Sequence, residues 1–335
     1  MTLAKRMAVT LPLNQSLNDT IDLVRWAEDS GFTDGWFADP GAPDGLTTAA
    51  AIAAHTEKLR IGMAIVPVYT RSLTVLAAST DVIAQALPGR FILGLGSSSE
   101  AIMQNFNGIK LEKPLTRVKE TAIVVRSILQ GEKTNFTDLE TVYSRGYSQL
   151  PTTPPVPIYL AGLRPRMLEM AAQYGDGVIL NLWPKSALPK MLEHIRIGAE
   201  RGSKKFEDIE VVNRYAVIVS EDKAQAYDLF RQHFIPYFSN PVYNNFLKWC
   251  GYEDEANELL EGWQSRDRER TAAAFHDGLV DQIGVVGTAE ECRERIRTHS
   301  SQGITTSIIA PVGRRNDLDG AYSTLSAFTS EEFQF

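Results

Sequence analysis

Short β-type runs alternate with amphipathic helical stretches along most of this 335-residue chain. Repeated strand–helix units joined by short turns imply parallel strands and right-handed crossovers. Eight strands are predicted, at Met7–Leu11, Gly35–Ala38, Arg60–Val66, Phe91–Leu95, Val156–Ala161, Val178–Leu182, Ile209–Val219 and Thr305–Ala310. The helical stretches between them include Leu17–Ser30, Leu73–Ala86, Pro114–Leu129, Arg166–Gln173 and Ala187–Arg201. Eight units favour an α/β fold closed into a (β/α)8 TIM barrel. An open doubly wound sheet is the alternative.

A long interval before the last predicted strand interrupts the alternation. Residues 224–281 are helical in pattern and rich in aromatic side chains, and an interval of this length indicates an insertion. We therefore expect a single barrel domain over residues 1–335 with a helical insertion at 224–281. The insertion forms a small subdomain with its own core, walls a substrate pocket, or does both, because loops at the C-terminal face of barrels carry function.

The charge and the cysteine content narrow the class of protein. A net charge of -7 without a dense basic patch argues against a nucleic-acid partner, and the sequence has no run of about 18 apolar residues to span a membrane. Cys250 and Cys292 match no zinc spacing, and the five histidines form no HxH or HExxH motif, so no metal site is expected. Reduced thiols fit a cytoplasmic protein.

The residues that follow the predicted strands contain few strong acid–base groups. Barrel active sites are built from these positions, and here the sequence has no nucleophile elbow, no neighbouring carboxylate pair and no metal cluster. The same positions are rich in glycine and small hydroxyl side chains. That composition is typical of a cradle for a planar, phosphorylated cofactor, which carries out the difficult chemistry itself.

Asp39 is the most distinctive polar residue at these strand ends. It follows the second predicted strand and precedes Pro40. Its carboxylate either caps backbone amides of the turn or lies near the ring of the cofactor.

The fourth predicted strand leads into Gly94-Leu95-Gly96-Ser97-Ser98-Ser99-Glu100. This is not a GxGxxG sequence, so it gives little support to a Rossmann fold. In one interpretation the glycines mark close packing and the serines cap the next helix. In the other, Gly94 and Gly96 let a flat ring approach while Ser97 and Ser98 donate hydrogen bonds.

The fifth predicted helix opens with Gly162-Leu163-Arg164-Pro165. Free amides at a helix N-terminus attract anions, and Arg164 adds a guanidinium fork, so a phosphate is the natural ligand. The alternative is an ordinary helix start with a solvated arginine. Thr288 and Glu291, in contrast, have the spacing of a capping box, which is a structural feature.

Five segments together resemble the luciferase-like monooxygenase family, in particular its branch that uses the deazaflavin coenzyme F420. They are Gly35–Asp39, Arg60–Arg71, Pro88–Ser98, Pro155–Val178 and Val285–Glu291, so the resemblance extends over nearly the whole chain. It implies a barrel with the isoalloxazine-type ring at its C-terminal face. It also implies a homodimer, and a distorted third strand whose bulge backs the ring, often through a non-prolyl cis peptide near Met63–Ala64.

The resemblance also implies a set of cofactor contacts. With Arg164, assigned above from its chemistry, the predicted cofactor-binding residues are Asp39, Met63, Ala64, Val66, Gly96, Ser97, Ser98, Ala161, Gly162, Leu163 and Arg164.

Three positions depart from patterns found within the family. Pro40 stands where some deazaflavin enzymes have a histidine, which weakens an interpretation as a sugar-phosphate or alcohol dehydrogenase with a histidine base. Glu100 follows a serine, whereas some members carry a glutamate shortly after the strand-four glycine. Thr10 and its neighbours occupy the strand that holds a glutamate in the pterin reductases, so a pterin substrate is not supported.

We therefore expect hydride transfer between coenzyme F420 and a small organic substrate, with Asp39 and Glu100 as the catalytic residues that tune or relay protons. An FMN-dependent monooxygenase that uses reduced FMN and oxygen is the alternative on the same fold. A non-catalytic flavin-binding barrel is a third hypothesis for the function, because the sequence shows no strong acid–base pair. The expected partners are a small-molecule substrate and a second copy of the chain, without nucleic acid or membrane.

Overall fold

The barrel predicted from the alternating pattern is present. The structure, a computed structural model, describes residues 3–39, 41–314 and 316–335, so Pro40 lies outside the described part. Within these ranges eight parallel strands form the barrel: β1 (Arg6–Leu11), β2 (Asp34–Phe37), β3 (Arg60–Met63), β5 (Phe91–Gly96), β8 (Ile158–Ala161), β9 (Gly177–Asn181), β10 (Glu210–Val219) and β12 (Thr306–Pro311). The ring closes because β1 pairs with both β2 and β12, and β10 pairs with both β9 and β12. This closure excludes an open doubly wound sheet.

Helices cover the outside of the barrel. They are α1 (Leu17–Asp29), α2 (Gly45–Ile52), α3 (Leu73–Ala86), α4 (Pro114–Leu129), α5 (Pro165–Tyr174), α6 (Leu188–Arg201), α12 (Ala289–Gln302) and α13 (Leu318–Ser326), with short 3-10 helices at η1 (Ala53–His55), η3 (Lys185–Ala187) and η4 (Phe206–Asp208). α3 and α4 begin and end at the predicted residues. Ser16 and Ser72 start α1 and α3 by accepting an amide hydrogen bond in the first turn. The apolar faces of the helices pack on the strands and form the main core.

One residue from each barrel strand fills the centre of the barrel. β3 contributes Gly62, and a β-carbon there would lie 2.4 Å from the indole ring of Trp36. The other strands contribute the buried side chains of Ala8, Trp36, Ile92, Tyr159, Ile179, Val212 and Ile308. The large indole thus takes the space left by the glycine, and the layer forms a packed floor beneath the C-terminal end of the barrel.

Ion pairs close the N-terminal end of the barrel. The Arg60 guanidinium pairs with both Asp34 and Glu210, and its Nη1 lies 2.8 Å from Glu210 Oε2. Glu210 also accepts hydrogen bonds from the hydroxyls of Tyr159 and Thr306. Burial alone would lower the pKa of Arg60, but its bonds to Glu210 and its attraction to Asp34 hold that pKa above its usual value. The polar groups at this end therefore satisfy one another, and the C-terminal end is the face available for ligands.

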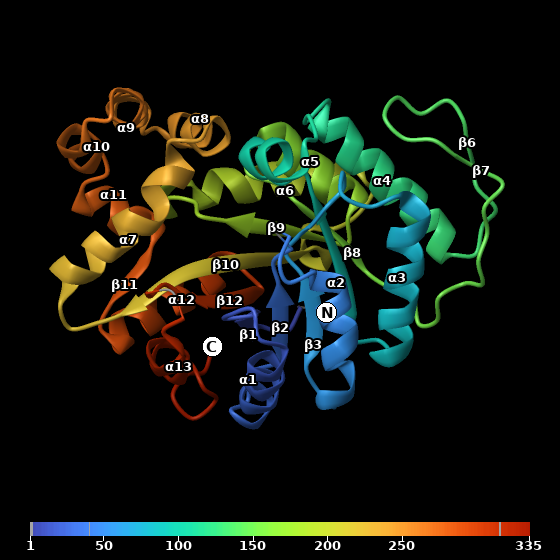
Figure 1. Ribbon diagram of the computed structural model, residues 1–335, viewed down its shortest axis with the longest axis horizontal. Helices are drawn as coiled ribbons and strands as arrows, with labels where there is room; N and C mark the ends of the chain where they lie inside the picture. Colours follow the sequence, from blue (N-terminus) through green and yellow to red (C-terminus); the bar gives the residue numbers. More distant parts are fainter. Residues whose placement is uncertain (1–2, 40, 315) are drawn as a thin grey trace.

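Five helices occupy the interval predicted to be an insertion. They are α7 (Lys223–Phe238), α8 (Pro241–Cys250), α9 (Glu253–Ser265), α10 (Arg268–Ala274) and α11 (Asp277–Ile283), and they gather on one side of the barrel (Figure 1). They share an apolar cluster that includes Phe230, Phe238 and Phe275. The same cluster takes in Ala216 and Ile218 of β10, so the core of these helices is continuous with the barrel wall.

The sequence pattern does not predict four short strands. β4 (Val66–Pro67) continues the third barrel strand after an interruption, and β11 (Val285–Gly287) pairs with the end of β10. β6 (Asn135–Phe136) and β7 (Ser144–Arg145) form a hairpin on the opposite side of the molecule from α7–α11 (Figure 1). β11 leads into α12, whose predicted capping box is confirmed, because the side chains of Thr288 and Glu291 each accept the other's amide hydrogen bond.

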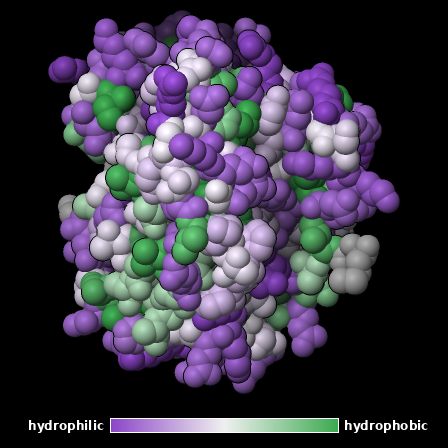
Figure 2. Space-filling view, turned by 90° about the vertical axis from the view of Figure 1, so that its right-hand side faces the viewer, coloured by the Kyte–Doolittle hydropathy of each residue, from purple (hydrophilic) through white to green (hydrophobic). Residues whose placement is uncertain are grey.

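The face of the molecule shown in Figure 2 is mainly hydrophilic, with apolar residues in small groups among the polar ones. Across the described residues, no helix combines the length and the apolar character needed to cross a bilayer.

Candidate active site

The third barrel strand is interrupted at its C-terminal end. β3 ends at Met63, the peptide bond between Ala64 and Ile65 is cis, and the chain resumes as β4 at Val66. We call Met63–Val66 the strand-three bulge; its cis bond lies one residue after the predicted position. Ala64 and Ile65 are partly exposed, whereas the side chains of Met63 and Val66 are fully buried between barrel and helices. Met63 and Val66 therefore offer a ligand only their main chain.

Gly94 and Gly96 make room for the strand-three bulge. A β-carbon on Gly94 would lie 1.7 Å from the carbonyl oxygen of Met63. A β-carbon on Gly96 would lie 2.9 Å from Ile65 Cγ1 and 3.2 Å from Ala161 Cβ. The glycines thus permit close packing of the chain on itself. They bring the bulge, the end of β5 and the end of β8 together as one surface, in which the Ile65 side chain packs on Gly96 beside Ala161.

Three serines continue from β5 around the rim of this surface. Ser98 has a φ of 61°, and the Ser97 hydroxyl donates to the Ser98 carbonyl oxygen at 3.2 Å. Ser99 lies just before Glu100, the N-cap of the π-helix η2 (Ala101–Phe106), and its hydroxyl accepts the amide hydrogen bond of Ile102 in the first turn at 3.3 Å. The structural interpretation of the serines is supported by this Ser99 bond. Ser97 and Ser98 are half-buried, and their hydrogen bonds to a cofactor stay a prediction. Glu100 follows them and is exposed.

The N-terminus of α5 adjoins the same surface. Gly162 is buried, and its amide donates to the Ile179 carbonyl oxygen at 3.1 Å, so that amide belongs to the barrel and is not free for an anion. Leu163 is half-buried, and Arg164 is the exposed N-cap of a helix that has Pro165 at its first position. Pro165 has no amide hydrogen, and the amides of Met167 and Leu168 both donate to the Arg164 carbonyl oxygen at 2.9 Å. Anion binding here would therefore depend mainly on the Arg164 guanidinium.

Asp39 is engaged through both of its carboxylate oxygens. Oδ1 accepts the Gly45 amide hydrogen bond at 3.0 Å, and Oδ2 lies 2.5 Å from Arg71 Nη1. Arg71 also pairs with Asp44, the N-cap of α2. Burial alone would lower the pKa of Arg71, but its hydrogen bond to Asp39 and the charges of both aspartates raise it. The capping role of Asp39 is therefore present in the structure, and its catalytic role stays a prediction.

Polar side chains that sequence reasoning did not single out line the C-terminal mouth of the barrel from β9, β10 and β1. Arg214 of β10 lies two residues beyond the interior residue Val212, and its Nε lies 3.4 Å from Thr10 Oγ1 of β1. Asn181, the last residue of β9, donates to the hydroxyl of Tyr243 of α8 at 2.9 Å. The sequence carries one signal for Arg214, which is a charged side chain inside the largely apolar seventh predicted strand, Ile209–Val219.

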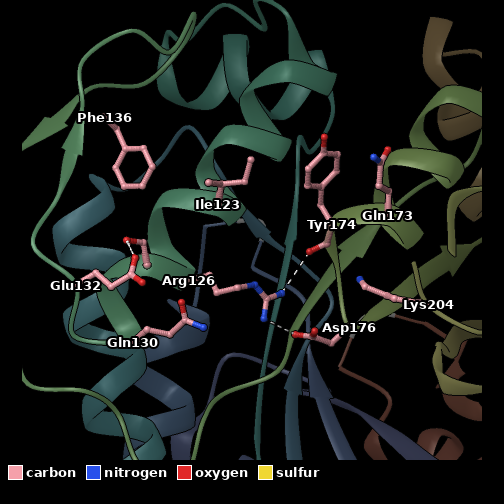
Figure 3. A pocket seen from close by; sticks show the side chains of 10 residues that line it. Ile123, Arg126, Gln130, Glu132, Phe136, Gln173, Tyr174, Asp176 and Lys204 are labelled. Atoms are coloured by element: carbon pink, nitrogen blue, oxygen red, sulfur yellow. Dashed lines mark hydrogen bonds and ion pairs between the residues drawn. The ribbon is translucent and has the colours of Figure 1, made fainter. Parts of the chain in front are cut away.

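Two surface hollows lie away from this mouth. One is bounded by α4, α5 and the start of the β6–β7 hairpin (Figure 3). There Arg126 lies 2.9 Å from the carboxylate of Asp176 and donates to the Tyr174 carbonyl oxygen at 3.3 Å. The other is lined by residues of α12 and by Lys185 and Lys223. Neither hollow contains a predicted site residue, and the charged groups named here are paired within the protein.

Known proteins resemble this chain over the whole architecture. A family model described as luciferase-like monooxygenase matches residues 1–306. The 5,10-methylenetetrahydromethanopterin reductase of Methanolobus tindarius is 26% identical over 294 residues, covering 87% of this chain and 89% of that protein. A putative coenzyme F420-dependent oxidoreductase of Mycobacterium tuberculosis is 24% identical over 317 residues, covering 86% and 89%. The solved coenzyme F420 dependent tetrahydromethanopterin reductase of Methanopyrus kandleri has the same fold, with a TM-score of 0.81 at 17% identity over 99% of this chain and 100% of that one.

Proposed function

This chain belongs to the luciferase-like monooxygenase family and is an oxidoreductase, and we propose that it uses coenzyme F420 to transfer a hydride to or from a small organic substrate. The observation that carries the proposal is the contiguous apolar surface made by the strand-three bulge, Gly96 and Ala161. Two relatives support it, since one is named an F420-dependent oxidoreductase and the other a methylenetetrahydromethanopterin reductase.

The residues at the mouth fit a planar cofactor that carries a phosphate. Ala64, Gly96 and Ala161 expose almost no side-chain bulk above the packed floor of the barrel. At the adjoining start of α5, the exposed Arg164 guanidinium suits an anion. When bound, the deazaflavin supplies or accepts two electrons as a hydride, so the protein needs few strong acid–base groups of its own.

The chain's own residues then have distinct tasks. The strand-three bulge backs the ring, and the Ser98 hydroxyl donates a hydrogen bond at its edge. The Ser97 hydroxyl donates to the Ser98 carbonyl oxygen and contacts the same edge through its oxygen. Leu163 and Arg164 hold the phosphate. Asp39 is fixed by Gly45 and Arg71, so we assign it a positioning and electrostatic task near the ring. Glu100 is exposed and is the carboxylate that we assign to proton transfer.

A parallel fluorescence titration of the purified protein with coenzyme F420 and with FMN tests the proposal. Tight binding of F420 alone supports a hydride-transferring reductase or dehydrogenase, and substrate screening would follow without oxygen. Tight binding of FMN alone would replace the proposal with an FMN-dependent monooxygenase, for which reduced FMN should drive oxygen uptake. Binding of neither would reject the cofactor assignment and leave the barrel unaffected.

The phosphate position has its own variant. Gly162 is unsuitable, because a side chain there would press on the Leu168 backbone at 3.0 Å. Arg164→Met leaves the packing intact and should weaken F420 binding roughly tenfold, the scale of one charge-assisted hydrogen bond. Arg145→Met, an equally exposed arginine on the β6–β7 hairpin, is the matched control. Equal affinity in the two variants would remove the start of α5 from the site.

Assembly into a homodimer is part of the proposal as well. It follows from the family resemblance alone, and light scattering of the purified protein measures it directly.

A further inference from the structure

Arg214 projects from the barrel wall into the mouth of the site. It pairs in register with Asn181 of β9 on one side and with Ile308 of β12 on the other. Its side chain reaches past β12 to β1, where Nε lies 3.4 Å from the hydroxyl oxygen of Thr10. The side chain is half-buried, so the guanidinium lies at the edge of the mouth and not in bulk solvent.

This guanidinium has no counter-charge in the described part of the chain. No carboxylate there comes within 4.0 Å of Arg214, whereas Arg60 at the other end of the barrel pairs with two. Burial lowers the pKa of Arg214, yet a guanidinium stays charged in proteins. A sheltered cation without an anion is costly, and a bound anion would remove that cost.

Two further groups beside Arg214 lack a full set of partners. Asn181 Nδ2 donates to the Tyr243 hydroxyl, but Asn181 Oδ1 is buried and accepts no hydrogen bond from any described residue. Burial raises the pKa of Tyr243 to about 12, so the phenol stays protonated. Since its oxygen already accepts from Asn181, its proton is available to a ligand. A cation, a donor and an acceptor thus share one side of the mouth.

We propose that Arg214, Asn181 and Tyr243 form a subsite for a carboxylate of the substrate, with Asn181 Oδ1 accepting from a neighbouring hydroxyl or amine of the same molecule. The assignment rests on the proposed function, in which the coenzyme occupies the surface formed by the strand-three bulge, Gly96 and Ala161 on β3, β5 and β8. A guanidinium fork matches the two oxygens of a carboxylate. Because Tyr243 belongs to α8, the proposal also makes the helices at 224–281 a wall of the pocket, which is the second interpretation of the insertion.

Binding of a matched acid and amide to the F420-loaded protein tests the subsite. Cinnamate and cinnamamide have the same shape and differ in charge, and their binding is followed by the absorbance of the bound coenzyme. We expect the wild-type protein to bind cinnamate at least tenfold more tightly than cinnamamide. Arg214→Met should abolish this preference while the Kd for F420 stays within twofold, and Arg214→Lys should keep part of it. Arg126→Met, the same substitution in the hollow of Figure 3, should behave as wild type.

The outcomes separate the two proposals. If F420 does not bind the wild-type protein, the proposed function fails. If F420 binds and the acid and amide bind alike, or neither binds, the subsite assignment is overturned and the proposed function stands. Weaker F420 binding by Arg214→Met would indicate that Arg214 binds the coenzyme and not the substrate, and it would also overturn the assignment. Displacement of cinnamate by inorganic phosphate at equal or lower concentration would overturn the choice of a carboxylate.

A second variant covers the case in which Arg214→Met does not fold. Asn181→Asp places a carboxylate at the position that pairs in register with Arg214 and leaves the arginine itself unchanged. We expect it to supply the missing counter-charge and so to lower cinnamate affinity at least tenfold with no change for cinnamamide. Unchanged cinnamate affinity would contradict the subsite.

Discussion

The α-carbon of Gly94 lies directly against the main-chain carbonyl of Met63, so that a β-carbon on Gly94 would be 1.7 Å from the carbonyl oxygen. No rotation of a side chain relieves this contact, because both partners are backbone. The position of the strand-three bulge, and of the surface that it shares with Gly96, therefore depends on glycine at position 94.

Gly94→Ala should displace the bulge. Overpacking of this kind costs about 1–3 kcal/mol of stability, and we expect F420 affinity to fall at least tenfold because the cradle is no longer flat. Gly313→Ala is the control, since it adds the same methyl group after β12 where the nearest atom is 3.9 Å away. Fluorescence titration and urea unfolding measure the two effects. Wild-type affinity in Gly94→Ala would show that the bulge does not form the cofactor surface.

Asp39 and Asp44 both pair with Arg71. A comparison of variants at these two aspartates therefore separates a role at the cofactor from a role in the ion pair. Each aspartate pairs with Arg71, and each accepts an amide hydrogen bond at the start of α2. The Asp39 carboxylate is buried and that of Asp44 is exposed, so Asp39→Asn should lose more stability than Asp44→Asn. If Asp39 acts at the ring, only Asp39→Asn should reduce F420-dependent turnover, by tenfold or more. Equal turnover in the two variants would confine Asp39 to its capping role.

Arg60 should be required for stability and not for cofactor binding. Arg60→Met would leave Asp34 and Glu210 buried without their cation, a loss on the order of 3–5 kcal/mol. Arg270→Met breaks pairs with Glu258 and Glu261 on an exposed helix and should change stability little. Urea unfolding of both variants measures the difference. A loss of F420 affinity in the folded Arg60→Met protein would contradict the division of the barrel into a structural end and a binding end.

The fold followed from periodicity because each barrel strand is a compact apolar run and each outer helix has a clear amphipathic face. α3 and α4 were predicted to the residue, whereas β11 was missed because three residues before a capping box carry little pattern. The insertion was placed by its length, but its packing on β10 depends on contacts between distant segments.

The sequence indicates one side of the candidate site only. The family resemblance implies the strand-three bulge and Ala161, and glycine-marked turns after strands indicate Ser97 and Arg164, while the binding roles of all of them stay predictions. Arg214 and Asn181 lie within or at the end of strands, and their roles depend on which face of the strand meets the barrel interior and on a tyrosine 62 residues further along the chain. Gly94 makes room for the Met63 carbonyl of the chain itself and not for a ligand, and this too is visible only in three dimensions.

His299 should make the protein less stable as the pH falls below about 6.5. The residue is 5% exposed, and the centroid of its ring lies 4.8 Å from that of Trp183 and 5.6 Å from that of Tyr215. Burial, and then the charges of Arg295 and Lys185, lower the pKa of His299 to about 4. An unfolded chain holds this proton with a pKa of about 6.5, so between pH 6.5 and 4 the unfolded state binds more protons and protonation favours unfolding. The stabilisation is complete above pH 6.5 and is lost progressively as the pH falls toward 4. Between pH 7 and pH 5 this loss of stability amounts to about 2 kcal/mol.

Urea unfolding of a His299→Leu variant at pH 7 and pH 5 tests this prediction. The difference in stability between the two pH values should be smaller in His299→Leu than in the wild type by about 2 kcal/mol. His233→Leu, at an exposed histidine of α7, should match the wild type. An identical pH dependence in His299→Leu would mean that this histidine is not held neutral in the folded protein.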